Sequence, residues 1–316
     1  MNSQKINNFN LGSLLTIENP TYKQWVFRYT FLELEKDLGE KGDITSNAVV
    51  PDEMKYPYKI ISKSAGILAG IQEIKYFLCD SDPNFKPRLG DIDVKFLKND
   101  GDIIVAGETI MILNARVRNI LMAERTILNL LQRMSGVATM ARKFVDAARN
   151  VSDHVLITPT RKTLWGLLDK RACAIGGAGT HRLNLEDAIL IKDTHLGLPG
   201  ITIENALKNA YKSAKSVGAR FVEIEIENIE DGVLAADTIN NFDDETTTFA
   251  IMLDNMTPSQ IAEFIKRVKR DRFLIEASGG INFENLAEYA KTGVDIISSG
   301  MLTQNAEPLD FSMETV

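Results

Sequence analysis

The sequence has few cysteines, few histidines and no long apolar stretch. Its two cysteines, Cys79 and Cys173, lie far apart with no CxxC spacing, and its three histidines are not clustered. This spacing argues against a disulfide framework and against a zinc site. No apolar run is long enough to cross a bilayer, and the first twenty residues lack the basic start and apolar core of a signal peptide. We therefore expect a cytoplasmic protein without a membrane contact.

An excess of basic residues is also missing. The chain has 36 Lys and Arg residues against 43 Asp and Glu residues, a formal net charge of −7. General binding to nucleic acid depends on a surplus of positive charge, so we expect no nucleic-acid partner. Any site for an anion must be a local pocket.

The first part of the chain predicts a small domain at residues 22–113. Residues 1–21 are rich in Asn and Ser with scattered apolar positions, and we expect an extension there that is loosely ordered or docks late. Apolar residues recur at helical spacing from Tyr22 to Leu38, and Gly39 is a suitable helix end. The segment DITSNAVVP that follows reads as a turn leading into a strand.

Short β-rich runs separated by Gly, Asp and Asn turns occupy residues 56–112. This pattern predicts a mainly antiparallel sheet with one helix near Gln72–Cys79. A long helical pattern then begins at residue 114, and we expect it to be broken or kinked near Ser135 and Gly136. After it, strand-like runs alternate with helical runs up to residue 302. Such βα repeats predict a parallel sheet, open or closed into a barrel, at residues 114–302.

Polar residues or glycines stand where each predicted strand of the second domain ends. In a parallel α/β barrel the carboxyl ends of the strands converge on one face, where active sites lie. We therefore expect one pocket to contain these residues together with the basic pair His181 and Arg182. The strand-end residues are Arg161, Lys162, Lys192, Glu225, Asp254, Ser278, Gly279, Gly280 and Gly300.

The charges of this predicted pocket favour a phosphorylated substrate bound with a metal ion. Carboxylates such as Glu225 and Asp254 suit Mg²⁺, which binds through one or two carboxylates and substrate phosphates. The turn SGGI is expected to open a helix and to offer main-chain N–H groups to a phosphate. Glu223, Glu225 and Glu227 alternate at strand spacing, and three acids on one barrel face would repel one another without cations.

Motifs along nearly the whole chain, about residues 30–312, resemble those of the quinolinate phosphoribosyltransferase family in order and spacing. They are EKDLGEKGDITS, AERTILNLLQRMSGVAT, TRKT, GGAGTHR, LIKDTH, VEIEIE, IMLDN, EASGGI and TGVDIISSG. The resemblance implies the type II phosphoribosyltransferase fold, with an N-terminal α/β sandwich domain and an open α/β barrel. It also implies that residues 303–316 complete the sandwich domain.

The same resemblance implies that a homodimer transfers a phosphoribosyl group to quinolinate in NAD biosynthesis, with release of pyrophosphate and CO₂. Arg125 from the other subunit would hold the two substrate carboxylates together with Arg161, His181 and Arg182, and bidentate guanidinium contacts suit carboxylates. In the catalytic set, Lys162 and Lys192 would neutralise the phosphates, whereas Glu225 and Asp254 would hold Mg²⁺ and the ribose hydroxyls. Main-chain N–H groups around Ser278, Gly279, Gly280 and Gly300 would receive the 5′-phosphate.

Several positions depart from the family pattern. Trp165 replaces a proline and Leu168 an arginine in the segment after TRKT, Ala178 interrupts a glycine run, Thr180 and Thr194 replace asparagines, and Gln304 replaces a histidine. The first two changes affect how an aromatic ring is held, or they repack the loop.

Two alternatives to the quinolinate enzyme follow. One is a ModD-like paralogue that acts on another aromatic acid. The other is a barrel of another class, either a non-catalytic phosphate-binding protein or an aldolase that uses Lys192 as a Schiff base. The aldolase is disfavoured, because its lysine needs a lowered pKa in an otherwise uncharged pocket.

Overall fold

The computed structural model describes residues 5–79, 89–243 and 246–316. The chain forms two compact units, each built from discontinuous segments. The barrel unit comprises residues 1–12, 143–164 and 177–305, and the antiparallel unit comprises residues 13–142, 165–176 and 306–316. The two units therefore interleave along the chain, whereas we expected residues 22–113 with 303–316 in one domain and residues 114–302 in the other.

The barrel unit contains a six-stranded sheet in the order β6-β11-β10-β9-β8-β7, and every neighbouring pair is parallel. β6 and β7 are edge strands, so the sheet is open, and the predicted α/β class is confirmed. The strands are β6 (Leu156–Pro159), β7 (Ile189–Ile191), β8 (Val222–Ile226), β9 (Phe249–Asp254), β10 (Phe273–Ser278) and β11 (Ile296–Ser299).

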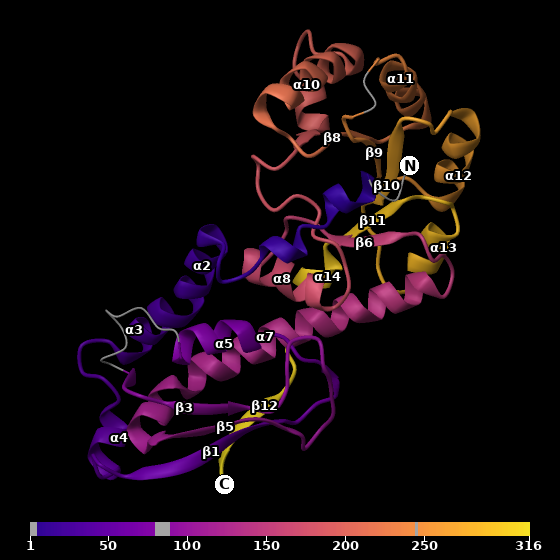
Figure 1. Ribbon diagram of the computed structural model, residues 1–316. Helices are drawn as coiled ribbons and strands as arrows, with labels where there is room; N and C mark the ends of the chain where they lie inside the picture. Colours follow the sequence, from indigo (N-terminus) through magenta and orange to yellow (C-terminus); the bar gives the residue numbers. More distant parts are fainter. Residues whose placement is uncertain (1–4, 80–88, 244–245) are drawn as a thin grey trace. The chain divides into compact units, whose positions relative to one another are not determined.

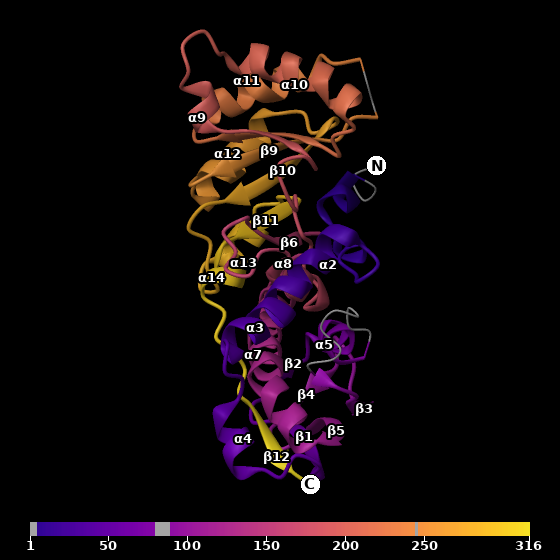
Figure 2. The same ribbon diagram turned by 90° about the vertical axis from the view of Figure 1, so that its left-hand side faces the viewer.

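Helices cover the outer side of this sheet (Figure 1 and Figure 2). The longest of them are α10 (Ile203–Val217), α11 (Ile229–Asn240) and α12 (Pro258–Arg267), each with a polar N-cap side chain that accepts a main-chain hydrogen bond. Such caps fix where each helix starts after its strand. Shorter helices are α9 (Asp193–Leu196), α13 (Leu286–Ala290) and α14 (Met301–Gln304).

The start of the chain contributes to the core of the barrel unit. Phe9, in the 3₁₀ helix η1 (Asn7–Phe9), is fully buried and packs with apolar residues near the amino ends of the barrel strands. Residues 5–12 are therefore docked on the barrel unit, which fits the second of the two arrangements that the sequence left open. Scattered apolar residues did not reveal that one aromatic ring fills a specific gap. The cluster around Phe9 consists of Ala188, Phe221, Ala250, Leu274 and Ile296.

The antiparallel unit contains a four-stranded sheet in the order β12-β1-β5-β3 and a small pair, β2-β4. In Figure 1, α5 (Ile71–Leu78) and the first part of α7 (Val117–Arg149) lie along one face of the larger sheet. The strand from residues 311–315 pairs with β1, which places the end of the chain in this unit. The strands are β1 (Lys55–Ser62), β2 (Gly66–Ile67), β3 (Asp93–Phe96), β4 (Ile103–Ile104), β5 (Thr109–Arg116) and β12 (Phe311–Thr315).

The predicted helix from Tyr22 to Leu38 is present in three consecutive parts. They are α2 (Pro20–Phe27), the π-helical turn η3 (Arg28–Leu32) and α3 (Glu33–Leu38), and Gly39 follows with a φ of +50°. The remaining elements of this unit are η2 (Gly12–Leu14), which begins at the last residue of the barrel unit, and α8 (Leu167–Ile175).

Two local predictions were wrong. The segment expected to turn into a strand is a helix, α4 (Ile44–Val49), because the Asp43 side chain caps it by accepting the N–H groups of Thr45 and Ser46. The break expected at Ser135 and Gly136 is absent, and α7 continues through both residues.

Tertiary contacts explain the continuous α7. The Ser135 hydroxyl bonds to the main chain of Ala69. A Cβ atom at Gly136 would lie 2.2 Å from the carbonyl oxygen of Glu307, so glycine permits a close approach of the chain. Both residues therefore serve packing and do not end the helix.

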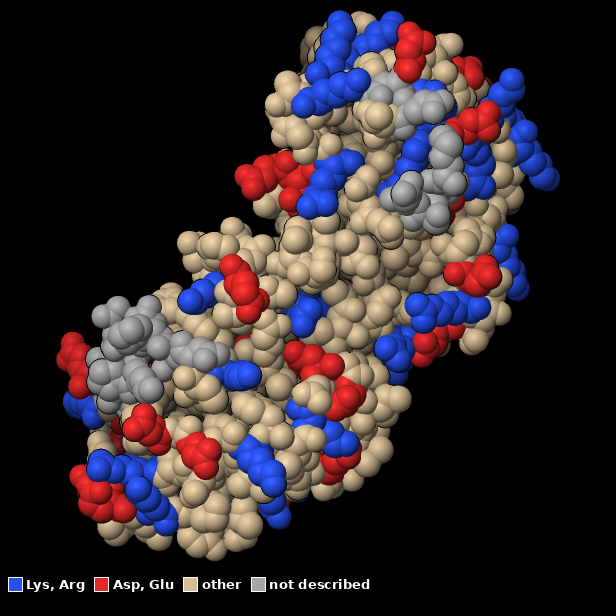
Figure 3. Space-filling view, viewed as in Figure 1, with Lys and Arg blue, Asp and Glu red and all other residues tan. Residues whose placement is uncertain are grey.

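Acidic and basic side chains are interspersed over the face seen in Figure 3. No broad basic area is visible among the described residues of that face. Within the described ranges, no helix is long and apolar enough to cross a membrane.

Candidate active site

All nine of the predicted strand-end residues line two cavities of the barrel unit. We call them the basic cavity and the glycine cavity, with volumes of about 340 and 350 Å³. The wall that they share consists of Thr160, Lys162, Asp254, Ser278 and Ser298. The remaining lining of the basic cavity is Arg161, His181, Arg182, Leu190, Lys192, Glu225 and Met252.

Both carboxylates of the basic cavity accept a hydrogen bond from a neighbouring side chain. The Lys192 ammonium group donates to Glu225 Oε2 at 2.9 Å, and Asn255 Nδ2 donates to Asp254 Oδ2 at 2.7 Å. Each carboxylate keeps a second oxygen, and carboxylate oxygens are ligands suited to Mg²⁺. The donor chemistry at Glu225 and Asp254 therefore fits a hard cation next to a polyanion.

His181, which lines the basic cavity, forms a buried cluster with Glu223 and Glu276. Nε2 of His181 is 3.0 Å from Glu276 Oε2 and 3.2 Å from Glu223 Oε2, and neither glutamate is exposed to solvent. The donor atoms all lie within 4.8 Å of one another, a spacing that hydrogen bonds or a metal ion can explain. Nε2 forms a hydrogen bond with Glu276 Oε2, whereas its contact with Glu223 Oε2 is an ion-pair distance without hydrogen-bond geometry.

The charges of this cluster change its protonation. Burial disfavours a charged imidazole, but Glu276 and Glu223 outweigh that effect and raise the pKa of His181 to about 9. Burial and the charge of Glu276 raise the pKa of Glu223 to about 7, although His181 opposes the rise. The three acids expected on one face therefore have different surroundings. Glu223 contacts His181, Glu225 contacts Lys192 and Glu227 is exposed.

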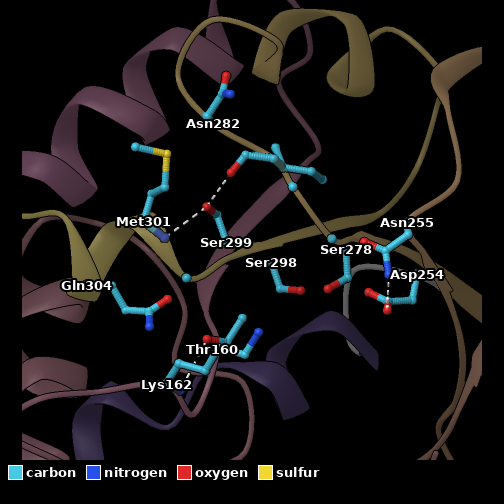
Figure 4. A pocket seen from close by; sticks show the side chains of 14 residues that line it. Thr160, Lys162, Asp254, Asn255, Ser278, Asn282, Ser298, Ser299, Met301 and Gln304 are labelled. Carbon is cyan, nitrogen blue, oxygen red and sulfur yellow. Dashed lines mark hydrogen bonds between the residues drawn. The ribbon is translucent and has the colours of Figure 1, made fainter. Parts of the chain in front are cut away.

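The glycine cavity has hydroxyl and amide side chains around main-chain turns. Figure 4 shows Ser278 and Asp254 on one side of this cavity and Met301 and Gln304 on the other. Gly279 has a φ of +88°, and a Cβ atom there would lie 2.3 Å from Asn255 Oδ1, so a side chain at this position would clash. The remaining lining includes Gly280, Ile281, Asn282, Ser299 and Gly300.

The expected helix after the SGGI turn was misplaced. β10 ends at Ser278, but α13 begins only at Leu286, so the glycines do not lie at a helix N-terminus. An anion in this cavity would meet turn N–H groups and serine hydroxyls. The favourable end of a helix dipole is not available at this turn.

Arg125 belongs to the antiparallel unit. It is exposed and lines a pocket of about 340 Å³ with Tyr29, Asn129 and Trp165, among others. The structure thus gathers Arg161, Lys162, His181, Arg182, Lys192, Glu225 and Asp254 in one unit and assigns Arg125 to the other.

The two departures after TRKT are packing positions in the antiparallel unit. The Trp165 ring stacks on Tyr29 with a centroid distance of 4.7 Å, and its main-chain N–H donates to Asp169. Leu168 is fully buried in α8. These contacts favour a repacked loop over a change in how a substrate ring is held.

Glu276, Ser298 and Ser299 lie in the motifs EASGGI and VDIISSG, but no role was predicted for them. The strand-period spacing between Glu276 and Ser278 could have indicated that both face the barrel interior. The hydroxyls before Gly300 were a second such signal. No sequence signal indicated that Phe9, so early in the chain, lies next to His181.

Comparison with known proteins identifies relatives of both parts of the chain. Residues 43–135 match the family model described as quinolinate phosphoribosyl transferase, N-terminal domain, and residues 137–314 match the corresponding C-terminal domain.

Curated relatives match over most of their lengths. A probable nicotinate-nucleotide pyrophosphorylase [carboxylating] of Methanothermobacter thermautotrophicus is 36% identical over 89% of this chain and 95% of its own. A mitochondrial quinolinate phosphoribosyltransferase [decarboxylating] of Nicotiana tabacum is 34% identical over 90% and 80%. Among solved structures, the nicotinate-nucleotide pyrophosphorylase of Ehrlichia chaffeensis has a TM-score of 0.78 and 31% identity, covering 93% of this chain and 98% of that one.

Proposed function

Because the chain belongs to the quinolinate phosphoribosyltransferase family, we propose that it transfers the phosphoribosyl group of phosphoribosyl pyrophosphate to quinolinate. The products are nicotinate mononucleotide, pyrophosphate and CO₂. The observation that carries the proposal is the basic cavity, in which Arg161, Arg182 and Lys192 gather opposite the carboxylates Glu225 and Asp254.

Quinolinate is a planar dicarboxylate, and the basic cavity offers matching groups. Arg161 and Arg182 supply guanidinium forks for the carboxylates. Leu190 and Met252 supply apolar contacts for the ring. His181 lies beneath, and its ring nitrogens bond to Glu276 and to the Arg182 main chain. We assign to it the role of fixing Arg182 beside the substrate.

The transfer needs no side-chain nucleophile. The ring nitrogen of quinolinate attacks the anomeric carbon as the bond to pyrophosphate breaks, and Lys162 and Lys192 neutralise the departing charge. Glu225 and Asp254 bind the ribose hydroxyls and stabilise the positive charge that develops on the sugar. The carbon that then loses CO₂ keeps the electron pair, which the pyridinium stabilises, and takes up a proton.

Magnesium is part of this proposal. Glu225 and Asp254 would hold Mg²⁺, and the ion would shield the pyrophosphate charge. The turn around Gly279 and Gly280 and the hydroxyl of Ser278 would receive the 5′-phosphate in the glycine cavity.

A cytoplasmic homodimer completes the proposal. In a two-fold dimer, Arg125 of each protomer would reach the substrate carboxylates bound by the other. Arg125 belongs to the antiparallel unit and is not among the residues that line the basic cavity, which motivates this assignment.

The decisive experiment gives the purified protein phosphoribosyl pyrophosphate, Mg²⁺ and either quinolinate or nicotinate. We expect equal amounts of pyrophosphate and CO₂ with quinolinate and no pyrophosphate with nicotinate. Pyrophosphate from nicotinate without CO₂ would contradict the assigned acceptor, and silence with both acids would contradict the assigned reaction.

A further inference from the structure

We propose that residues 5–12, with Phe9 at their centre, are a positioning element that holds His181 and Arg182 in place for substrate binding. The inference rests on the proposed function, in which Arg182 binds a carboxylate of quinolinate. None of these residues at the start of the chain lines either cavity, so any effect on binding must be indirect.

Phe9 fills space that the barrel strands leave open. Barrel interiors are usually packed by bulky branched residues, but Ala188 and Ala250 occupy two of the interior positions here. The Phe9 ring lies beside them and stacks on Phe221 with a centroid distance of 3.9 Å and an interplanar angle of 16°. The ring is fully buried, so it completes the core instead of resting on its surface.

The same residue contacts His181 through both its ring and its main chain. The Phe9 and His181 rings meet edge to face with a centroid distance of 5.3 Å. The Phe9 carbonyl oxygen accepts the N–H groups of Thr180 at 3.0 Å and of His181 at 2.8 Å. Phe9 therefore holds both the main chain at Thr180 and His181 and the imidazole of His181.

Thr180 makes a second link. Its hydroxyl accepts the N–H of Leu11 at 2.8 Å and donates to the carbonyl oxygen of His181 at 3.0 Å. The side chain is fully buried, and it stands where the family pattern has an asparagine. The threonine hydroxyl thus ties residues 5–12 to the loop that carries His181 and Arg182.

His181 needs such support because its main chain is strained. Its φ is +53°, a left-handed conformation that a residue with a side chain rarely adopts and that persists only when neighbouring contacts impose it. In this conformation Nδ1 accepts the N–H of Arg182 at 2.9 Å, while Nε2 faces Glu276. The strain thereby sets the direction in which the chain presents Arg182 to the basic cavity.

Two pairs of variants test the proposal in the full-length protein. Thr180→Val keeps the shape of the side chain and removes the hydroxyl, whereas Thr180→Ser keeps the hydroxyl. Phe9→Ala removes the ring, and Phe264→Ala is the matched control, because Phe264 is an equally buried phenylalanine of the same unit on α12. The Thr180 pair keeps the test valid if Phe9→Ala fails to fold.

The first measurement is independent of activity. The chain has only three histidines, so the imidazole NMR signals of His181 can be assigned with one His181 variant. We expect these signals to shift in Phe9→Ala and Thr180→Val and to stay in place in Phe264→Ala and Thr180→Ser. Unchanged His181 signals in both of the first two variants would overturn the proposal.

The second measurement separates positioning from general stability. We expect the KM for quinolinate to rise by roughly tenfold or more in Thr180→Val, with a nearly constant KM for phosphoribosyl pyrophosphate, since small misplacements of binding groups are costly. An equal rise in Phe264→Ala would also overturn the proposal. If the His181 signals shift as expected but wild type transfers to no acceptor, the positioning element is supported and the proposed function is wrong.

Discussion

The main-chain N–H of Arg182 donates to Nδ1 of His181 at 2.9 Å. Nδ1 is therefore an acceptor, and the imidazole proton lies on Nε2, toward Glu276 and Glu223. The raised pKa of His181 favours a second proton on the imidazole, but that proton on Nδ1 would break this hydrogen bond. With Nδ1 accepting, one further proton lies on Glu223 and leaves the three groups with a single negative charge. This charge lies beneath the arginines of the basic cavity and stabilises them.

The pH dependence of stability should reveal Glu223. Its pKa rises from 4.5 in the unfolded chain to about 7 in the folded protein, so the folded state binds the proton more tightly. The resulting stabilisation is complete below about pH 4.5 and is lost as the pH rises through about 7. We expect Glu223→Gln to remove this decline, on the order of 1–3 kcal/mol.

Urea unfolding of wild type and Glu223→Gln between pH 4.5 and pH 7.5 would measure this decline in the free energy of unfolding. Glu227→Gln, at an exposed position just after the same strand, is the control and should leave the pH profile unchanged. Parallel profiles for wild type and Glu223→Gln would show that Glu223 does not take up this proton.

Arg161→Ala should weaken quinolinate binding and largely spare phosphoribosyl pyrophosphate. Hydrogen bonds to charged groups contribute about 1.5–3 kcal/mol, which corresponds to a roughly tenfold to hundredfold rise in KM for quinolinate. Steady-state kinetics with each substrate varied in turn would measure this, with Arg267→Ala on the exposed side of α12 as control. Normal quinolinate binding by Arg161→Ala would remove Arg161 from the clamp.

Asp254→Asn should weaken the metal-dependent step. The substitution keeps the shape of the side chain but removes a charge from the shared wall of the two cavities. We expect the Mg²⁺ concentration for half-maximal rate to rise about tenfold or more, because carboxylates are the protein ligands that Mg²⁺ uses. Exposed Asp271→Asn is the control, and an unchanged Mg²⁺ dependence in Asp254→Asn would argue against a metal role.

Mixing two inactive variants would test whether Arg125 acts across a dimer. Arg125→Ala and Asp254→Ala should each be nearly inactive alone. If the subunits exchange at random, half of the dimers are heterodimers. Each heterodimer has one intact site, so the mixture should recover about a quarter of the wild-type activity. No recovery, despite subunit exchange confirmed by native mass spectrometry, would place Arg125 in the same chain's site or outside any site.

Leu168→Arg, which restores the residue of the family pattern, should destabilise this protein. Leu168 is fully buried in α8, and an unpaired buried charge typically costs several kcal/mol. A fall in the melting temperature should therefore accompany it, whereas Leu32→Arg, at a half-exposed position of the same unit, should have little effect. A stable Leu168→Arg protein would mean that this loop accepts the family arrangement.

The sequence predicted the parallel strands and most of the site because strand ends carry strong local signals. Lys192 directly follows β7, Glu225 is the next-to-last residue of β8 and Asp254 ends β9, and the barrel topology brings them together. The helix at residues 44–49 escaped prediction because a single Asp43 cap decided it. The role of Phe9 could not be predicted, since it depends on gaps left by Ala188 and Ala250, which are far away in sequence.

The interleaving of the two units has a consequence for biosynthesis. The antiparallel sheet needs β12, the last described strand, to pair with β1, and the barrel core needs Phe9 from the start of the chain together with β11. Neither unit can therefore finish folding until most of the chain has been synthesised. Non-local pairing of this kind folds slowly and exposes apolar strands in the meantime. Expression at low temperature or with chaperones should increase the yield of folded protein.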